Sequence, residues 1–111
     1  MDESKFLSLL GMCRKAGRLS CGHDSSLESI KAKKAKLCIF SSDSSERLRK
    51  EIEKECEYAR LDLKTVTVKA DMEEIGRATA LKSAVLTVND EGFAKAMLKA
   101  LDENAEENVN D

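Results

Sequence analysis

Residues 16–43, AGRLSCGHDSSLESIKAKKAKLCIFSSD, contain the succession of elements that decides the fold. A short extended segment, Leu19–Cys21, leads through Gly22 into a predicted helix over residues 24–33, and an apolar strand follows at Leu37–Phe40. Gly22 can adopt backbone angles that are closed to other residues, and it precedes a helix N-terminus, where unpaired N–H groups favour an anion such as phosphate. The stretch therefore predicts a strand–helix–strand unit with an anion-binding bend at its first turn.

Helix and strand signals alternate on both sides of this unit. Apolar residues at helical spacing predict a helix over Ser4–Lys15 that ends before Gly17, and β-branched or apolar runs predict strands over residues 65–68 and 84–88. Alternation at this length predicts an α/β fold, a three-layer α/β/α sandwich with a central mixed sheet of about four strands.

Three polar turns carry the signals of helix N-termini. Asp43, with Glu46 three residues later, predicts a variant capping box, and Asp71 with Glu74 predicts a second one. Asn89 or Asp90 is expected to cap the final helix in the same way.

Length and composition indicate one soluble globular domain. The chain has 111 residues, of which 41% are hydrophobic and 36% charged, and no apolar run approaches the roughly 18 residues that span a bilayer. We therefore expect a single domain over residues 1–103, a cytoplasmic location, and an acidic, disordered tail over residues 104–111.

The distribution of charge is more informative than its sum. The formal net charge is −2, but bases crowd the first third of the chain and acids the last ten residues. A chain of this kind can bind phosphate locally while its total charge stays negative. We therefore hypothesise an RNA-facing surface around the bend at Gly22; the alternative is an ordinary solvated charged surface.

The sequence gives little reason to predict an enzyme. It contains no phosphate-binding P-loop and no Gly-x-Gly-x-x-Gly, and His23, Asp24 and Ser25 are consecutive, so they cannot be presumed to converge as a triad does.

The cysteines have no metal-binding or redox spacing. No Cys-x-x-Cys pair is present, and we interpret Cys13, Cys21, Cys38 and Cys56 as structural thiols without a metal. A redox enzyme that uses Cys13 or Cys21 is the alternative, and it would need an exposed thiol of lowered pKa.

Four segments occur in a familiar order and spacing: KFLSLLGMCRKAGRLSCG (5–22), IKAKKAKLCIFSSDSSE (30–46), MEEIGRAT (72–79) and AVLTVNDEGFAKAM (84–97). Together they strongly resemble the kink-turn RNA-binding family of ribosomal proteins, the L-seven-Ae and L-thirty-e type, and above all its small bacterial YlxQ-like branch. The resemblance implies an L-thirty-e-like fold, a cytoplasmic setting linked to the ribosome or translation, and no cofactor. It also implies structured RNA as the partner, ribosomal or kink-turn-like, with ribosomal or translation proteins beside it.

The resemblance also implies where RNA would bind. In that family a Gly-x-Asn-Glu-x-x-Lys signature opens the second helix, and this chain keeps its glycine at Gly22. Asp24 replaces the asparagine, Ser25 the glutamate and Glu28 the lysine. An acid at position 28 is repelled by the RNA backbone, and it can instead serve as the partner of Ser25 in a capping box.

The predicted RNA-binding residues combine this signature with nearby bases and with the loop before the fourth helix. They are Gly22, His23, Asp24, Ser25, Glu28, Lys31, Lys34, Lys36, Arg18 and Lys69. The altered signature leaves one alternative, a protein-interaction module on the same scaffold. The growth-arrest and DNA-damage proteins, which the chain resembles distantly, use the scaffold in that way.

Overall fold

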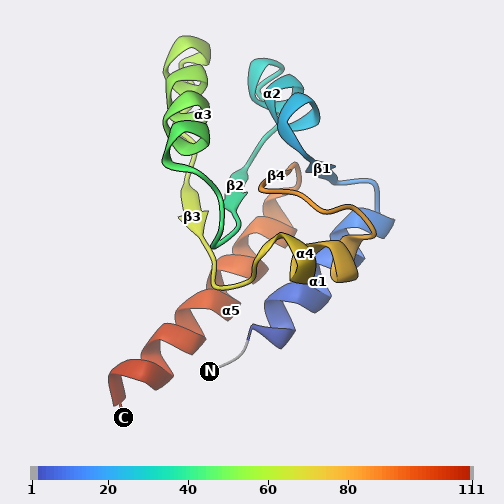
Figure 1. Cartoon of the computed structure of the whole chain (residues 1–111), viewed down its shortest axis with the longest axis vertical. Helices are drawn as coiled ribbons and strands as arrows, with labels where there is room; N and C mark the ends of the chain where they lie inside the picture. The colour runs from blue at the N-terminus through green and yellow to red at the C-terminus, as the bar shows by residue number, and fades with distance from the viewer. Residues whose placement is uncertain (1–2, 111) are drawn as a thin grey trace.

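A computed structural model describes the backbone of residues 3–110 and the side chains of residues 3–102 (Figure 1). Helices and strands alternate along most of the chain, in the order α1 (Ser4–Lys15), β1 (Leu19–Cys21), α2 (His23–Lys31), β2 (Leu37–Phe40), α3 (Glu46–Ala59), β3 (Thr65–Thr67), α4 (Met72–Thr79), β4 (Val85–Val88) and α5 (Glu91–Asn110).

The strands form one mixed sheet in the order β1-β4-β2-β3. β4 runs antiparallel to both β1 and β2, whereas β3 is parallel to β2. Helices α1, α4 and α5 cover one face of the sheet, and α2 and α3 cover the other (Figure 1). The predicted three-layer α/β/α sandwich is therefore confirmed.

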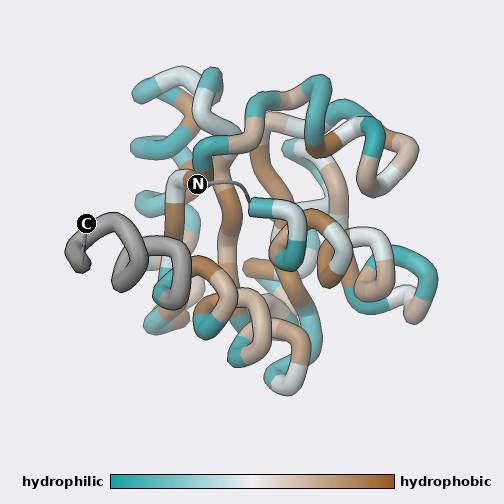
Figure 2. The backbone as a smooth tube through the Cα atoms, turned by 90° about the horizontal axis from the view of Figure 1, so that it is seen from below, coloured by the Kyte–Doolittle hydropathy of each residue, from teal (hydrophilic) through white to brown (hydrophobic). Residues whose placement is uncertain are grey.

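The sheet separates two apolar layers because successive strand residues point to opposite faces. In β2, Leu37 and Ile39 pack with α1, α4 and α5, while Cys38 and Phe40 pack with α2 and α3. All four residues of β2 and of β4 are buried, as expected for central strands covered on both faces. Figure 2 shows the hydrophobic stretches running through the middle of the molecule, with hydrophilic segments outside them.

Two of the predicted helix caps form. The Asp71 side chain accepts the Glu74 N–H at 2.9 Å, and the Glu74 side chain accepts the Asp71 N–H at 3.4 Å, which completes the predicted capping box of α4. At the start of α5, Asp90 rather than Asn89 accepts the Phe93 N–H, at 2.8 Å.

Two other predicted caps were wrong. Ser45, not Asp43, caps α3, since its Oγ accepts the Leu48 N–H at 3.1 Å. Asp43 instead accepts the Met72 N–H at 3.2 Å and so joins the turn before α3 to the start of α4. The expected capping box of Ser25 and Glu28 does not form either, because α2 begins at His23 and both residues lie inside the helix.

Beyond residue 102 the structure describes only the backbone, as far as residue 110. The prediction that residues 104–111 form a disordered tail lies outside the described side chains and stays a prediction. Among the residues that the structure does describe, no helix has the length and apolar character to cross a bilayer.

Candidate nucleic-acid interface

Gly22 forms a sharp bend between β1 and α2. Its φ of 94° and ψ of 173° lie in a region that is essentially restricted to glycine. The Gly22 N–H donates to the Val85 carbonyl at 2.9 Å, which fixes the bend against the start of β4. No side chain caps the helix that follows, and His23, Asp24 and Ser25 are exposed. The first N–H groups of α2, which have no intrahelical partner, are therefore open to an external acceptor.

His23 connects this helix N-terminus to α3. Its Nε2 lies 2.7 Å from Glu51 Oε2, and its Nδ1 lies 3.3 Å from Asp24 Oδ1. Hydrogen bonds to the Glu51 carboxylate and then to that of Asp24 raise the pKa of His23 above its ordinary value. The arrangement favours an imidazolium beside the open amides of α2.

We expect the pKa of His23 to lie above the ordinary histidine value of about 6.5. Since the folded pKa exceeds the unfolded one, the bond to Glu51 stabilises the fold below the unfolded pKa, and this contribution is lost as pH rises through the folded pKa. Replacing Glu51 with Gln should lower the NMR titration midpoint of His23. Glu53→Gln, a charge loss on the same helix, is the control, and equal midpoints in both variants would contradict the assignment.

The segment before β4 borders the bend, although it lies about 60 residues further along the chain and was not among the predicted RNA-binding residues. Ser41 N–H donates to the Ala84 carbonyl at 3.0 Å, so this segment lies between the ends of β1 and β2. It carries Leu81, which is 46% exposed, and Lys82, whose Nζ lies 3.2 Å from Glu73 Oε1. The bond from the Gly22 N–H to the Val85 carbonyl brings the end of this segment to the bend, and this contact depends on the pairing of β4 with β1, which no local sequence pattern predicts.

The structure divides the predicted bases between the two ends of the sheet. Asn89 N–H donates to the Arg18 carbonyl at 2.8 Å and Lys36 N–H to the Val88 carbonyl at 2.7 Å, so Arg18 and Lys36 lie at the end of β4 opposite Gly22. Lys31 and Lys34 lie near the same end, because α2 runs away from Gly22.

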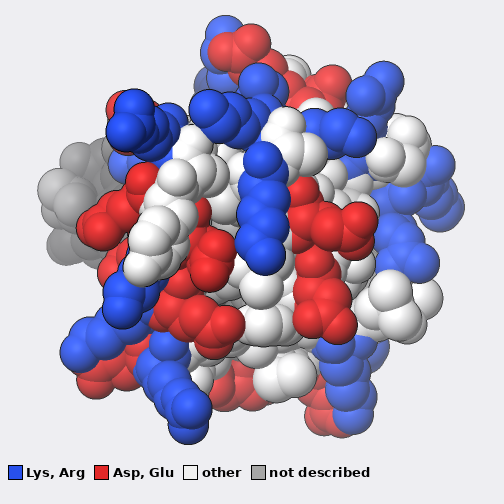
Figure 3. Space-filling view, turned by 90° about the horizontal axis from the view of Figure 1, so that it is seen from above, with Lys and Arg blue, Asp and Glu red and all other residues white. Residues whose placement is uncertain are grey.

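Lys69 follows β3 at the Gly22 end of the sheet but near the far edge, where its N–H donates to Glu3 at 3.1 Å. Figure 3, which views the layer of α2 and α3, shows acids and bases interleaved rather than one continuous basic patch. The ten predicted residues therefore do not form one cluster.

Three of the predicted residues do share a hollow on the flank of α2. Its volume is about 250 Å³, and it is lined by Ser20, Ser25, Glu28, Ser29, Ala32 and Lys34. The hydroxyls of Ser20 and Ser29 lie 2.7 Å apart, and the Asn89 amide donates to the Ser20 oxygen at 2.9 Å. Glu28 and Lys34 therefore face a small polar recess with ordered hydroxyl groups at its base.

Three of the four cysteines are buried thiols. Cys13, Cys38 and Cys56 are buried, and burial raises the pKa of Cys13 to about 11 and that of Cys38 to about 12. A thiol of raised pKa is a poor nucleophile, which argues against the redox alternative at Cys13. Within the described residues, no group of three or more His, Cys, Asp or Glu side chains is placed to hold a metal ion.

Fold and site together define a three-layer α/β/α domain with an open helix N-terminus behind a glycine. The model of the ribosomal protein L7Ae/L30e/S12e/Gadd45 family matches residues 4–98, and the chain belongs to this family.

Two curated relatives confirm the resemblance to the YlxQ-like branch. The chain is 28% identical to RNA-binding protein YlxQ of Bacillus subtilis (strain 168), over 92% of this chain and all of the relative. It is 27% identical to RNA-binding protein YlxQ of Enterococcus faecium, over 85% of this chain and 88% of that one.

Solved structures agree on the fold. A Bacillus halodurans protein of unknown function superposes with a TM-score of 0.74 at 27% identity, covering 88% of this chain and 97% of that one. The Giardia lamblia 15.5kD RNA binding protein superposes with a TM-score of 0.64 over 93% of this chain and 88% of that one. At 15% identity, the second likeness concerns the fold alone.

Proposed function

We propose that the chain is a non-catalytic RNA-binding protein of the kink-turn type, with altered recognition residues. It acts in the cytoplasm on ribosomal or translation-related RNA. The observation that carries the proposal is the uncapped, exposed N-terminus of α2 behind Gly22. Family membership and two relatives named RNA-binding proteins support it.

In the proposed complex, an RNA phosphate accepts hydrogen bonds from the first amides of α2, beside the His23 ring that Glu51 and Asp24 hold in place. Leu81, exposed on the neighbouring segment, offers an apolar surface to an unstacked base. Arg18, Lys31, Lys34 and Lys36 contact phosphates further along the RNA, at the other end of the sheet.

Glu28 changes which part of the RNA the second helix would contact. Its carboxylate repels phosphate but accepts hydrogen bonds from the amino and imino groups of bases. In the hollow beside Lys34, Glu28 therefore favours a base edge over the sugar–phosphate backbone.

Titration of the purified protein with a kink-turn RNA and with a straight duplex of the same length tests the proposal. We expect tighter binding to the kink-turn, and an affinity that falls with salt because phosphate neutralisation releases counterions. The absence of binding to either RNA at low salt would overturn it.

Replacing Glu28 with Lys should raise the affinity for the kink-turn by about tenfold, because the gained attraction to the phosphates exceeds the loss of a hydrogen bond to a base edge. Glu57→Lys makes the same change of charge near the C-terminus of α3 and is the matched control. If both variants gain equally in the titration, the gain reflects net charge, and the placement of Glu28 at the RNA would be wrong.

A protein-interaction module on this scaffold is the second candidate. The interleaved charges over α2 and α3 and the acids Asp24 and Glu28 favour it (Figure 3). Partners that stay bound in a native pull-down after ribonuclease treatment would support this candidate, whereas partners released by ribonuclease would support RNA binding.

A further inference from the structure

β3 is an edge strand whose outer side is open. Among the strands that the structure describes it pairs only with β2, in a parallel ladder in which Cys38 N–H donates to the Lys64 carbonyl and Val68 N–H to the Phe40 carbonyl, each at 2.9 Å. In such a ladder alternate residues face the neighbour, so the backbone groups of Thr65 and Thr67 point away from β2. No hydrogen bond within the described part of the chain occupies these outward groups.

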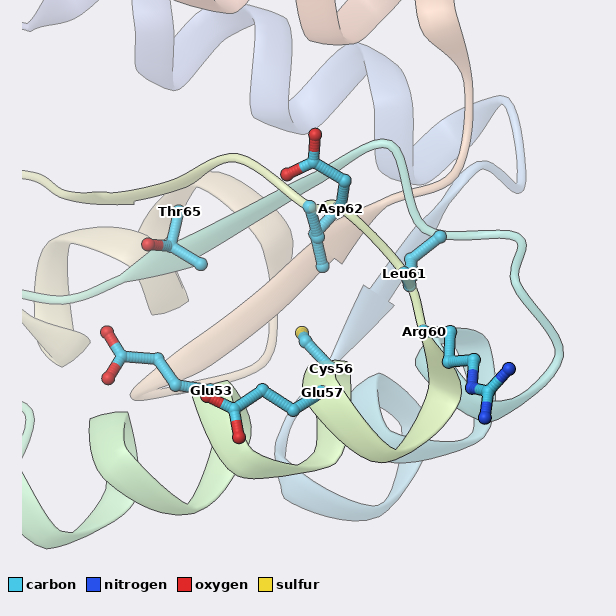
Figure 4. Close-up of a pocket in the computed structure, with 8 residues that line it drawn as sticks. Glu53, Cys56, Glu57, Arg60, Leu61, Asp62 and Thr65 are labelled. Carbon is cyan, nitrogen blue, oxygen red and sulfur yellow. The ribbon is translucent and has the colours of Figure 1, made fainter.

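A groove adjoins this open edge. It has a volume of about 530 Å³, lies between the C-terminal half of α3 and the start of β3, and is lined by Glu53, Cys56, Glu57, Arg60, Leu61, Asp62, Leu63 and Thr65 (Figure 4). Cys56 is 8% exposed, and Leu61 and Leu63 are half-buried, so the groove has an apolar floor. Because Thr65 belongs to both features, a chain that pairs with β3 runs along the rim of the groove.

The groove is acidic. Figure 4 shows the Glu53 and Glu57 side chains side by side, whereas the Arg60 guanidinium extends away from them. Within the described residues neither glutamate forms an ion pair, and neither does Asp62 on the rim. Like charges four residues apart weaken an isolated helix, so Glu53 and Glu57 are not explained by the stability of α3.

We propose that the edge of β3 and the adjoining groove bind an extended, basic segment of a protein partner. Its backbone adds a strand beside Thr65 and Thr67, and an arginine or lysine lays its aliphatic stem on the floor near Cys56. The cationic head of that side chain lies between Glu53 and Glu57. A nucleic acid does not fit this groove, since its phosphates are repelled by the same carboxylates.

A second copy of the chain is a poorer occupant. An antiparallel pair of β3 strands centred on Val66 places Thr67 of one copy opposite Thr65 of the other, so the groove beside Thr65 receives an uncharged side chain there and not a cation. In a basic partner strand whose cations occupy every second position, all the cations point to the groove face of the sheet. The side chains between them point to the other face, where Lys64 lies.

The proposed groove is separate from the proposed RNA site. The groove adjoins β3, at the opposite edge of the sheet from β1, and none of the residues that line it is among the ten predicted RNA-binding residues. One molecule can therefore hold RNA and a basic protein segment at once, and failure of either binding event leaves the other intact.

A synthetic hexapeptide in which arginine alternates with threonine tests the proposal by NMR titration of the full chain. We expect the Thr65 and Thr67 amide resonances to shift and their hydrogen exchange to slow by about tenfold at saturation. The double variant Glu53→Gln/Glu57→Gln should bind about fivefold more weakly, as the loss of two partly exposed ion pairs implies.

Two controls separate the proposal from general charge attraction. Glu46→Gln/Glu91→Gln removes the same charge from exposed sites outside the groove and should bind as the unaltered chain does. The same hexapeptide N-methylated at alternate residues cannot form the ladder and should not protect Thr65 or Thr67.

Three results would overturn the proposal. These are no binding, equal weakening in both double variants, and binding that leaves the two threonine amides unprotected. Peptide-independent dimerisation seen by sedimentation, abolished by Thr67→Pro in a folded variant, would assign the edge to a second copy instead.

Discussion

Replacing Phe6 with alanine is expected to lower the free energy of unfolding by about 4 kcal/mol. Phe6 is 0% exposed and lies in the core cluster that α1, α4 and α5 form with the sheet. Removing the ring leaves a cavity that these elements close only in part, so the loss includes lost contacts as well as lost burial. Urea unfolding followed by circular dichroism measures the change.

Met12→Ala is the matched control for this loss. Met12 is also on α1 but is 57% exposed, so its truncation should change the free energy of unfolding by no more than about 0.5 kcal/mol. A loss below about 1 kcal/mol for Phe6→Ala would mean that α1 does not cover the sheet as the structure places it.

The secondary structure could be predicted where the signal is local. The helix over Ser4–Lys15 and the strands Leu19–Cys21 and Leu37–Phe40 have the predicted bounds, because their apolar spacing and flanking turns lie within each segment. Asp71 and Glu74 form the predicted capping box for the same reason.

The predicted cap of α3 was wrong because a backbone group from a distant part of the chain binds the Asp43 carboxylate. Asp43 has the composition of a helix cap, but its carboxylate binds Met72, which lies 29 residues further along the chain. Ser45 is then left to cap α3. The choice depends on the approach of α4 to the turn after β2, which the sequence around Asp43 does not contain.

In the candidate site, too, the features set by local sequence could be predicted and those set by tertiary contacts could not. The bend at Gly22 could be predicted because glycine before a polar helix start is a local signal. The contact of His23 with Glu51 could not, since it requires α2 to pack on α3, and the position of Leu81 requires β4 to pair with β1. The lysines that follow α2 lie at the far end of the helix from Gly22, as their place in the sequence predicts, because a helix of nine residues separates them from the bend.

Replacing Gly22 with alanine should cost about 3 kcal/mol of folding stability, because φ of 94° with ψ of 173° is nearly closed to residues with a Cβ. A Cβ at this position meets nothing within 4 Å, so the cost comes from the backbone and not from a steric clash with neighbours. The bend must relax to accept alanine. We therefore also expect the first amides of α2 to move and the affinity for a kink-turn RNA to fall by about tenfold.

Gly17→Ala is the matched control for the losses of stability and RNA affinity expected of Gly22→Ala. Gly17 also has a positive φ, 73°, and open space around its Cβ, but non-glycine residues adopt such a φ elsewhere in this structure, as Ala80 does at 72°, so alanine should cost only about 1 kcal/mol. Urea unfolding and RNA titration of both variants measure the two effects. Equal losses of stability, or an unchanged RNA affinity in a folded Gly22→Ala protein, would contradict the role assigned to the bend, because only Gly22 joins a glycine-restricted conformation to the open amides of α2.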